Sequence, residues 1–277
     1  MTSIDDNLSR QSVLAVYFRC LKGVVWREGL RFFQQRGRLI AALVRPLVWL
    51  LIFAAGFRAT LGLSIIPPYE TYVLYDVYIV PGLVGMIQMF NGMQSSLSLV
   101  YDREMGSMKV LMTSPLPRWY LLTCKLLAGC FVSLLQVYTF LLVAYLFGIE
   151  LPLLGYLAVL PVLLVTGLML GAVGMLLSTF VKQLENFAGV MNFVIFPAFF
   201  LSSALYPLWK MKESSELLYW LCTFNPFTYA VEFLRFSLYL KFSLLATGWT
   251  FFCLALFLSA AIWAYDPKRG LGGVGRG

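Results

Sequence analysis

The hydrophobic pattern divides the chain into six long apolar runs separated by shorter polar or basic segments. Each run has about the 20 residues that an α-helix needs to cross a hydrocarbon core of roughly 30 Å. The runs are apolar on all faces rather than alternating in polarity, which favours membrane-spanning helices over a membrane β-barrel. The six predicted spans are Leu39–Phe57, Tyr78–Val100, Leu121–Phe147, Leu153–Thr179, Phe187–Leu208 and Ala246–Tyr265.

Composition supports the same class of fold. Hydrophobic residues make up 60% of the 277 residues and charged residues only 12%, whereas a soluble domain averages about 25% charged. We therefore predict an all-α integral membrane protein with a cytoplasmic N-terminal segment over residues 1–38, a six-helix transmembrane domain over residues 39–265 and a cytoplasmic tail over residues 266–277. The first apolar run follows a long basic segment, so no secretory signal peptide is evident.

Residue types that support enzymatic chemistry are scarce. The chain has no histidine, which excludes a Ser/His/Asp triad, and its five cysteines form no CxxC pattern, which argues against a transition-metal site. The P-loop pattern GxxxxGK[ST] is absent because no lysine follows a glycine, and the "GLGGVGRG" tail has no strand before it and no helix after it. We expect no metal site, no cofactor, no nucleic-acid partner and no P-loop ATP hydrolysis by this chain.

Basic residues divide unequally between the two sides of the predicted spans. Fifteen fall in the N-terminal segment, the 101–125 region, the 180–186 turn and the tail, against five in the other connecting segments. Because cytoplasmic loops carry the excess of lysine and arginine, this division places both termini in the cytoplasm. The remaining basic residue, Arg45, lies inside the first predicted span, where an unpaired charge costs about 3 kcal/mol. We expect it to reach the cytosolic face or to find a partner, with a structural role favoured over a transport role.

A charged stretch, "YDREMGSMKVLMTSPLPRW", separates the second and third predicted spans on the cytoplasmic side. Asp102, Arg103 and Glu104 precede Gly106, which allows a turn, and an apolar patch follows. We expect a short amphipathic helix at the membrane surface that ends before Pro115, because the residue before a proline disfavours the α region. Such a helix can bind a cytosolic partner, whereas a solvated loop that only fixes the topology fits the same residues, and both interpretations remain open.

The N-terminal segment is basic and amphipathic. At helical spacing its apolar residues fall on one face, and basic residues such as Arg19, Arg27 and Arg31 fall on the opposite face. This pattern predicts a helix in the headgroup plane of the membrane, although Gly23 and Gly29 argue against one unbroken helix. A basic anchor that only binds anionic lipid remains an alternative. The predicted apolar face comprises Leu14, Phe18, Leu21, Val25 and Phe32.

The segment between the fifth and sixth spans is apolar but broken by prolines such as Pro207 and Pro226. Irregular apolar backbone is tolerated at membrane depth only where protein buries it or water lines it. We therefore predict an external helix hairpin that dips partway into the outer half of the bilayer, with Asn225-Pro226 as the turn into its second limb. Glu232 and Arg235 lie three residues apart on that limb and can form an ion pair, favoured as structural over a substrate site.

Small residues recur in the fourth predicted span. Its "GLMLGAVG" run, from Gly167 to Gly174, has glycines at a spacing that lets helix backbones approach closely. We expect this close packing within the chain rather than between chains.

Several motifs, in order, resemble the permease subunits of type 2 ABC exporters. The stretch "PGLVGMIQMFNGMQSSLSLVYDREMGSMKVLMTSPLPRWYLLTCKLL" is similar to that family's Pro-Gly-bearing second span, Asp-Arg-Glu-x-Gly loop, Ser-Pro-x-x-Arg break and lysine-marked third span. "RPLVWLLIFAAGF", "FFLSSALYPL" and "NPFTYAVEFLR" resemble its first span, the end of its fifth span and its final external element. The resemblance covers nearly the whole chain from Arg31 to Tyr265 and is strongest to the drug, lipo-oligosaccharide and nodulation-factor export branch.

The resemblance implies that this chain is a homodimeric permease of the bacterial inner membrane. Two copies of a separate ABC ATPase subunit would power the export of an amphipathic or lipid-linked molecule, along a path between the first, second and fifth spans at the dimer interface. The charged stretch would be a coupling helix. Together with the N-terminal connecting helix it would form the contacts that pass the closing movement of the ATPase to the spans, and the external hairpin would be a re-entrant element. The residues implied are Asp102, Arg103, Glu104, Gly106, Pro115 and Arg118 in coupling, Arg19, Arg27 and Arg31 in the connecting helix, and Pro207, Asn225, Pro226, Glu232 and Arg235 in the re-entrant element.

Two other classes of function remain as alternatives. A polytopic enzyme acting on lipid needs Asp, Glu or His clustered at one membrane face, but the acidic pairs Asp102/Glu104 and Glu213/Glu216 fall on opposite sides. A proton-coupled secondary transporter needs carboxylates near mid-membrane, and none of the six predicted spans holds one.

Overall fold

The computed structural model describes residues 2–34, 44–52, 67–69, 73–104, 116–181 and 183–265, with the backbone alone at residues 2–14, 31, 102–104 and 118. Every extended regular element in these ranges is an α-helix, which confirms the prediction of an all-helical protein. Besides the helical residues 44–52, the helices are α1 (Thr2–Gln34), α3 (Tyr75–Glu104), α5 (Arg118–Leu146), α6 (Leu153–Phe180), α7 (Leu184–Phe200), α8 (Leu208–Ser214), α9 (Glu216–Phe224), α10 (Pro226–Leu238) and α11 (Leu244–Ala264).

Among the described residues, three helical segments are long and apolar enough to cross a membrane. They are Trp119–Leu146 in α5, Leu153–Phe180 in α6 and Leu244–Ala264 in α11, and they coincide within a few residues with the third, fourth and sixth predicted spans. Helix α3 contains the second predicted span and, with 30 residues, extends beyond it at both ends. Residues 44–52 are helical within the first predicted span, and the rest of that span lies outside the described residues.

The fifth predicted span is wrong at its C-terminal end. Helix α7 stops at Phe200, well before the predicted end, and turns follow over residues 201–206. Pro197 lies in its last turn and has no amide hydrogen to donate to the helix. The carbonyl oxygen of Ser203, in the turns, accepts hydrogen bonds from the side chains of Tyr78 and Arg235. Side chains from other helices thus satisfy backbone groups that a continued helix would have satisfied itself.

The charged stretch after the second span also differs from the expectation. Asp102, Arg103 and Glu104 form the last turn of α3 instead of the start of a separate surface helix. No glycine or proline occurs between Gly92 and Glu104, so nothing local ends the helix earlier. Residues 105–115, with Gly106 and Pro115, lie outside the described residues.

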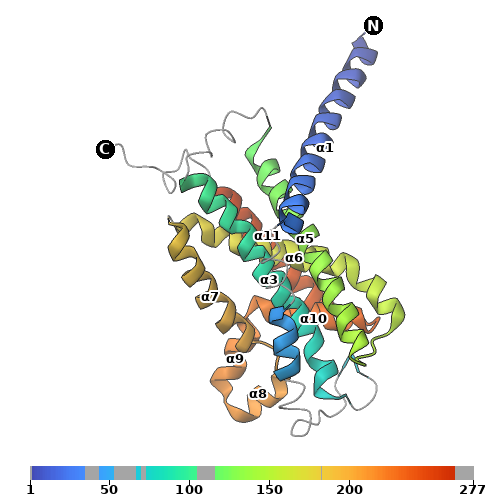
Figure 1. The fold of residues 1–277 in the computed structure, drawn as a ribbon, viewed down its shortest axis with the longest axis vertical. Helices are drawn as coiled ribbons and strands as arrows, with labels where there is room; N and C mark the ends of the chain where they lie inside the picture. The colour runs from blue at the N-terminus through green and yellow to red at the C-terminus, as the bar shows by residue number, and fades with distance from the viewer. Residues whose placement is uncertain are drawn as a thin grey trace.

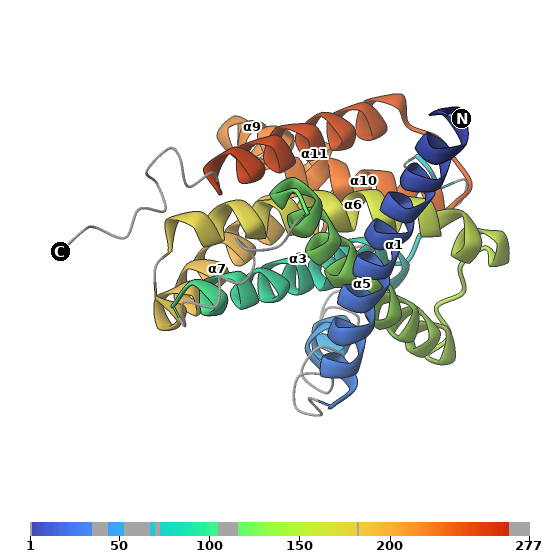
Figure 2. The same ribbon diagram turned by 90° about the horizontal axis from the view of Figure 1, so that it is seen from above.

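The long helices form a bundle in which α6 packs against α3, α5, α10 and α11. The C-terminal ends of α3, α6 and α11 lie at one end of this bundle, together with the start of α7 (Figures 1 and 2). The starts of α3, α6 and α11 lie at the opposite end. Helix α1 crosses α5, and its N-terminal part extends away from the bundle (Figure 1).

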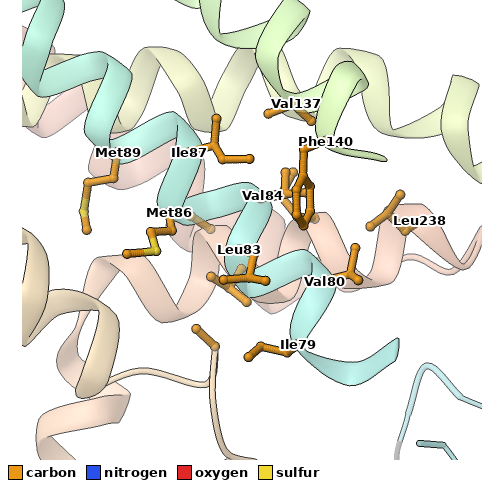
Figure 3. Packing of buried hydrophobic residues seen from close by; sticks show 14 of the residues in the cluster. Ile79, Val80, Leu83, Val84, Met86, Ile87, Met89, Val137, Phe140 and Leu238 are labelled. Carbon is orange, nitrogen blue, oxygen red and sulfur yellow. The ribbon is translucent and has the colours of Figure 1, made fainter. Parts of the chain in front are cut away.

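Apolar side chains fill the space between these helices. Phe140 of α5 points toward Val84 of α3, and Leu238 of α10 belongs to the same buried cluster (Figure 3). Because lipid is as apolar as these side chains, close packing and polar contacts hold such helices together more than hydrophobic burial does.

Glycines bring α3 and α6 into close contact. A Cβ atom on Gly92 would lie 2.8 Å from the Cα of Gly171, and one on Gly174 would lie 2.9 Å from the carbonyl oxygen of Gly92. Backbone atoms cannot rotate away as a side chain can, so these positions exclude larger residues. This confirms that the glycines of the fourth span serve packing within the chain.

Candidate functional site

The charged end of α3 carries three of the residues predicted to transmit coupling. Asp102, Arg103 and Glu104 form its last turn, and Arg118 is the first residue of α5, directly after Pro117. The C-terminal end of a helix carries a partial negative charge, so a carboxylate there costs about 0.3–1 kcal/mol rather than stabilising the helix. The dipole of α3 therefore does not favour acidic residues at these two positions.

Helix α1 is anchored to the start of α5. The hydroxyl of Tyr120 donates a hydrogen bond to the carbonyl oxygen of Tyr17 (2.6 Å), and the two rings meet edge to face with centroids 4.6 Å apart. The helix runs unbroken through Gly23 and Gly29, contrary to the expectation, although each glycine costs about 1 kcal/mol relative to alanine. Since α5 begins where the charged stretch ends, this contact brings α1 next to the predicted coupling region.

The predicted apolar face of α1 divides between two environments. Phe32 is buried, with 4% of its surface exposed, whereas Phe18 is 68% exposed. Of the predicted basic residues, Arg19 is exposed, Arg27 forms an ion pair with Glu28 at 3.1 Å, and Arg31 is described by its backbone alone. Large apolar rings beside basic side chains suit the interface between lipid tails and headgroups. One exposed side carries Phe18, Arg19, Lys22, Trp26 and Phe33.

At the opposite end of the bundle, Asn225 joins α7 to α10. Its Oδ1 accepts a hydrogen bond from the amide of Phe227 (3.0 Å), so it caps α10, which begins at Pro226 as the sequence predicted. Its Nδ2 donates to the carbonyl oxygens of Ala198 (2.7 Å) and Leu201 (2.5 Å). The side chain of Asn225 thereby provides hydrogen-bond partners for backbone groups at the end of α7 and at the start of α10. Pro207 precedes the short helix α8 between them.

The predicted ion pair of Glu232 and Arg235 is present on α10. Arg235 is 2% exposed, its guanidinium carbon lies 4.1 Å from the ring centroid of Tyr78, and its Nη2 donates to the carbonyl oxygen of Ser203 (2.8 Å). Burial raises the pKa of the nearby Tyr69 to about 12, so that ring stays neutral beside the arginine. Arg235 has a carboxylate, an aromatic ring and a carbonyl as partners, and this arrangement favours a structural clamp for the segment between α7 and α11 over a substrate site.

Sequence reasoning overlooked a layer of buried polar residues midway along the spans. The amide of Gln88 donates from Nε2 to the carbonyl oxygen of Leu163 (2.7 Å), and its Oε1 lies 2.7 Å from the hydroxyl of Thr166. Asn91 of α3 donates from Nδ2 to Oε1 of Gln136 of α5. Amides inside apolar spans are the signal that marks these positions, because such groups need partners in lipid.

Arg45 lies beside this polar layer. Its guanidinium carbon is 3.9 Å from the ring centroid of Phe90, which is near the middle of α3. Among the residues that the structure describes, no carboxylate lies within ion-pair distance of Arg45. The partner expected for Arg45 is therefore the aromatic ring of Phe90, which attracts the guanidinium through a cation–π interaction of about 0.5–2 kcal/mol.

Within the described ranges, no group of His, Cys, Asp or Glu side chains can hold a metal ion. All five cysteines are free thiols, and Cys124, Cys130, Cys222 and Cys253 are buried.

Comparisons with known proteins agree with the sequence motifs. A family model described as ABC-2 type transporter matches residues 19–239. The putative transport permease ycf38 of Cyanophora paradoxa is 29% identical over 207 residues, which cover 72% of this chain and 67% of that protein. The putative transport permease ycf38 of Porphyra purpurea is 27% identical over 223 residues, which cover 78% of this chain and 72% of that protein. The probable multidrug ABC transporter permease YbhR of Escherichia coli K12 is 29% identical over 184 residues, or 65% of this chain and 48% of that protein.

Proposed function

The chain belongs to the ABC-2 type transporter family, as a multi-pass permease subunit whose partner is an ATPase subunit, and we propose that it exports an amphipathic or lipid-linked molecule. The match of the family model across residues 19–239, from α1 through α10, carries this proposal. The similarity to a protein named as a multidrug permease supports export and the drug, lipo-oligosaccharide and nodulation-factor branch. Family membership decides against a lipid-modifying enzyme and a proton-coupled secondary transporter.

In the proposed mechanism, the end of α3 and the start of α5 receive the closing movement of the ATPase. Asp102, Arg103, Glu104, Gly106, Pro115 and Arg118 form this coupling region, supported by the two carboxylates at the unfavourable end of α3. Helix α1, with Arg19, Arg27 and Arg31, is the connecting helix. The hydrogen bond between Tyr120 and Tyr17 supports this role because it ties α1 to the first turns of α5.

We further propose that two permease copies and two ATPase subunits assemble in a bacterial cytoplasmic membrane. Each permease has a cytoplasmic segment over residues 1–38, six spans over residues 39–265 and a cytoplasmic tail over residues 266–277. Both termini face the cytoplasm, which the fifteen-to-five division of basic residues supports. The common end of α3, α6 and α11 (Figure 2) is then the cytoplasmic end, where lipid headgroups contact the exposed side of α1. The external segment with Pro207, Asn225, Pro226, Glu232 and Arg235 is the re-entrant element.

The purified chain alone should hydrolyse no ATP, and hydrolysis should appear when the chain is co-expressed with its ATPase subunit and purified as a complex. The chain lacks a phosphate-cradling loop, so the activity must come from the partner. Phosphate release in detergent measures both cases, with mass spectrometry to exclude contaminants. Hydrolysis by the contaminant-free permease, or no ATPase in the purified complex, would count against the proposed function.

The orientation predicts that Ser214, exposed at the end of α8, faces the outside of the cell. A Ser214→Cys variant should react in intact cells with a maleimide that does not cross membranes, whereas a cysteine introduced at Gly277 should react only after the cells are opened. The parent chain, with its native thiols, serves as the blank. The reverse pattern of labelling would show that the chain is inserted the other way round.

A further inference from the structure

A polar pocket lies beside the middle of α3, between residues 44–52, α3 and α5. Its walls are Arg45, Phe90, Asn91, Gln94 and Gln136, together with the apolar residues Pro46, Met86 and Ile87. Phe90 and Asn91 are about 20 Å from either end of the 30-residue helix α3, at 1.5 Å per residue. The pocket is therefore at the depth where an ionised group is most costly and usually functional.

The pocket offers hydrogen-bond donors that the described chain does not satisfy. Gln136 is 2% exposed, its Oε1 accepts from Asn91, and its Nε2 is buried without a hydrogen-bond partner among the described residues. Arg45 adds a positive charge whose partner there is the ring of Phe90, with no carboxylate in reach. A cation and an unpaired amide donor together favour an acceptor that carries negative charge.

The size of the pocket limits what enters it. The cavity measures about 20 Å³, and one water molecule needs about 10–15 Å³. It therefore holds one oxygen-sized group, such as a single carboxylate or phosphate oxygen, while the remainder of a headgroup stays outside the cavity, next to the half-buried Arg45. Val44 and Val48 lie on the same helical segment as Arg45, and their exposed side chains offer an apolar surface for a chain attached to that headgroup.

A polar stripe continues from the pocket toward the C-terminal end of α3, as far as Ser98. Gln94, Ser95 and Ser98 lie three to seven residues after Asn91, on the same side of the helix, and all three are half-buried. The hydroxyls of Ser95 and Ser98 bond to the helix backbone at 2.9 and 2.6 Å, so their oxygens keep acceptor lone pairs for water. In the proposed orientation this stripe runs from the inner leaflet to mid-membrane, a route along which a charged group can remain hydrated.

We propose that this pocket binds the carboxylate or phosphate of an anionic amphiphile, with Arg45 as the counter-ion and Gln136 as a hydrogen-bond donor. The inference rests on the proposed function, because it narrows the cargo from amphipathic molecules in general to those with an anionic headgroup. The apolar chain of the cargo lies against Val44 and Val48, and the headgroup enters along the stripe of α3.

Radiolabelled laurate, bound to the purified chain in the neutral detergent dodecyl maltoside, tests the proposal. Excess unlabelled laurate and dodecyl phosphate should displace it, whereas dodecanol and dodecyltrimethylammonium, with the same chain length, should be at least tenfold weaker. Arg45→Gln should lower laurate affinity at least tenfold. Gln136→Glu places a nearly isosteric carboxylate in the pocket, which should neutralise Arg45 and abolish laurate binding.

Lys212→Gln is the matched control, since it removes one positive charge from an exposed position on α8 and should leave binding unchanged. Size-exclusion profiles and thermal midpoints report whether each variant is folded. If Arg45→Gln does not fold, Gln136→Glu tests the pocket in its place. Equal displacement by dodecanol, or unchanged binding in both pocket variants, would overturn the proposal and leave the pocket as a water site.

A second arm separates cargo from bilayer lipid. Laurate binding should persist in nanodiscs of phosphatidylcholine and of phosphatidylglycerol, and its loss in phosphatidylglycerol alone would show that the pocket takes anionic membrane lipid instead. Binding needs no ATPase subunit. If laurate binds but the purified complex does not hydrolyse ATP, the result therefore counts against the proposed function and not against the site. If the complex hydrolyses ATP but laurate does not bind, the result counts against the site alone.

Discussion

A Glu104→Ala permease should insert and fold normally but lose transport. Glu104 ends α3, where the helix dipole disfavours a carboxylate by about 0.3–1 kcal/mol, so its removal leaves the fold intact or slightly more stable. If the carboxylate pairs with a group of the ATPase, truncation leaves that group unpaired in the interface at a cost of about 2–5 kcal/mol. The expected result is weaker binding of the ATPase, or ATP hydrolysis that no longer drives export.

Co-purification of the ATPase and efflux of an amphipathic dye from cells, both normalised to the amount of inserted permease, measure this effect. Glu213→Ala is the matched control, because Glu213 is an exposed glutamate on α8, on the proposed external side. It should retain near wild-type efflux. Full efflux and normal ATPase binding in Glu104→Ala would show that the charged stretch only fixes the topology.

A Gly155→Ala permease should lose much of its folded stability. A Cβ atom at Gly155 would lie 1.9 Å from the carbonyl oxygen of Leu238, so α6 and α10 would have to separate. The hydrogen bond from the hydroxyl of Ser237 to the carbonyl oxygen of Ala158 (2.9 Å) joins the same two helices and would be strained by that separation. Overpacking lowers the free energy of unfolding by about 1–3 kcal/mol, occasionally more. Because the obstacle here is a backbone atom, we expect Gly155→Ala to lie at or above the upper end of that range.

Thermal unfolding in detergent measures this loss. By the relation for soluble proteins of this size, a cost of about 3 kcal/mol lowers the midpoint by about 10 °C. Gly248→Ala is the control, since it makes the same change in α11 at a position where nothing lies within 4 Å of the new atom. That variant should be neutral or slightly stabilised through better helix propensity. A Gly155→Ala midpoint equal to that of Gly248→Ala would mean that α6 and α10 are not in contact as described.

The sequence by itself determined the features that depend on neighbours along the chain. Hydropathy located the spans in α5, α6 and α11, since a helix that crosses lipid needs about 20 apolar residues in a row. The Asn225-Pro226 start of α10 follows from proline and capping chemistry, and the pair of Glu232 and Arg235 follows from a spacing of one helical turn. The order of the motifs was likewise enough to indicate the transporter family.

Only the tertiary structure decided the features that depend on partners distant in sequence. Helix α7 ends early because Tyr78, Asn225 and Arg235 satisfy the backbone of its last residues and of the turns after it, at separations of 24 to 125 residues. Asn91 and Gln136 are hydrogen-bonded but lie 45 residues apart in the sequence, so no local sequence pattern predicted the pocket beside them. Lipid provides little hydrophobic force between helices, and the final arrangement therefore depends on individual polar contacts and close glycine crossings, which averaged hydropathy does not detect.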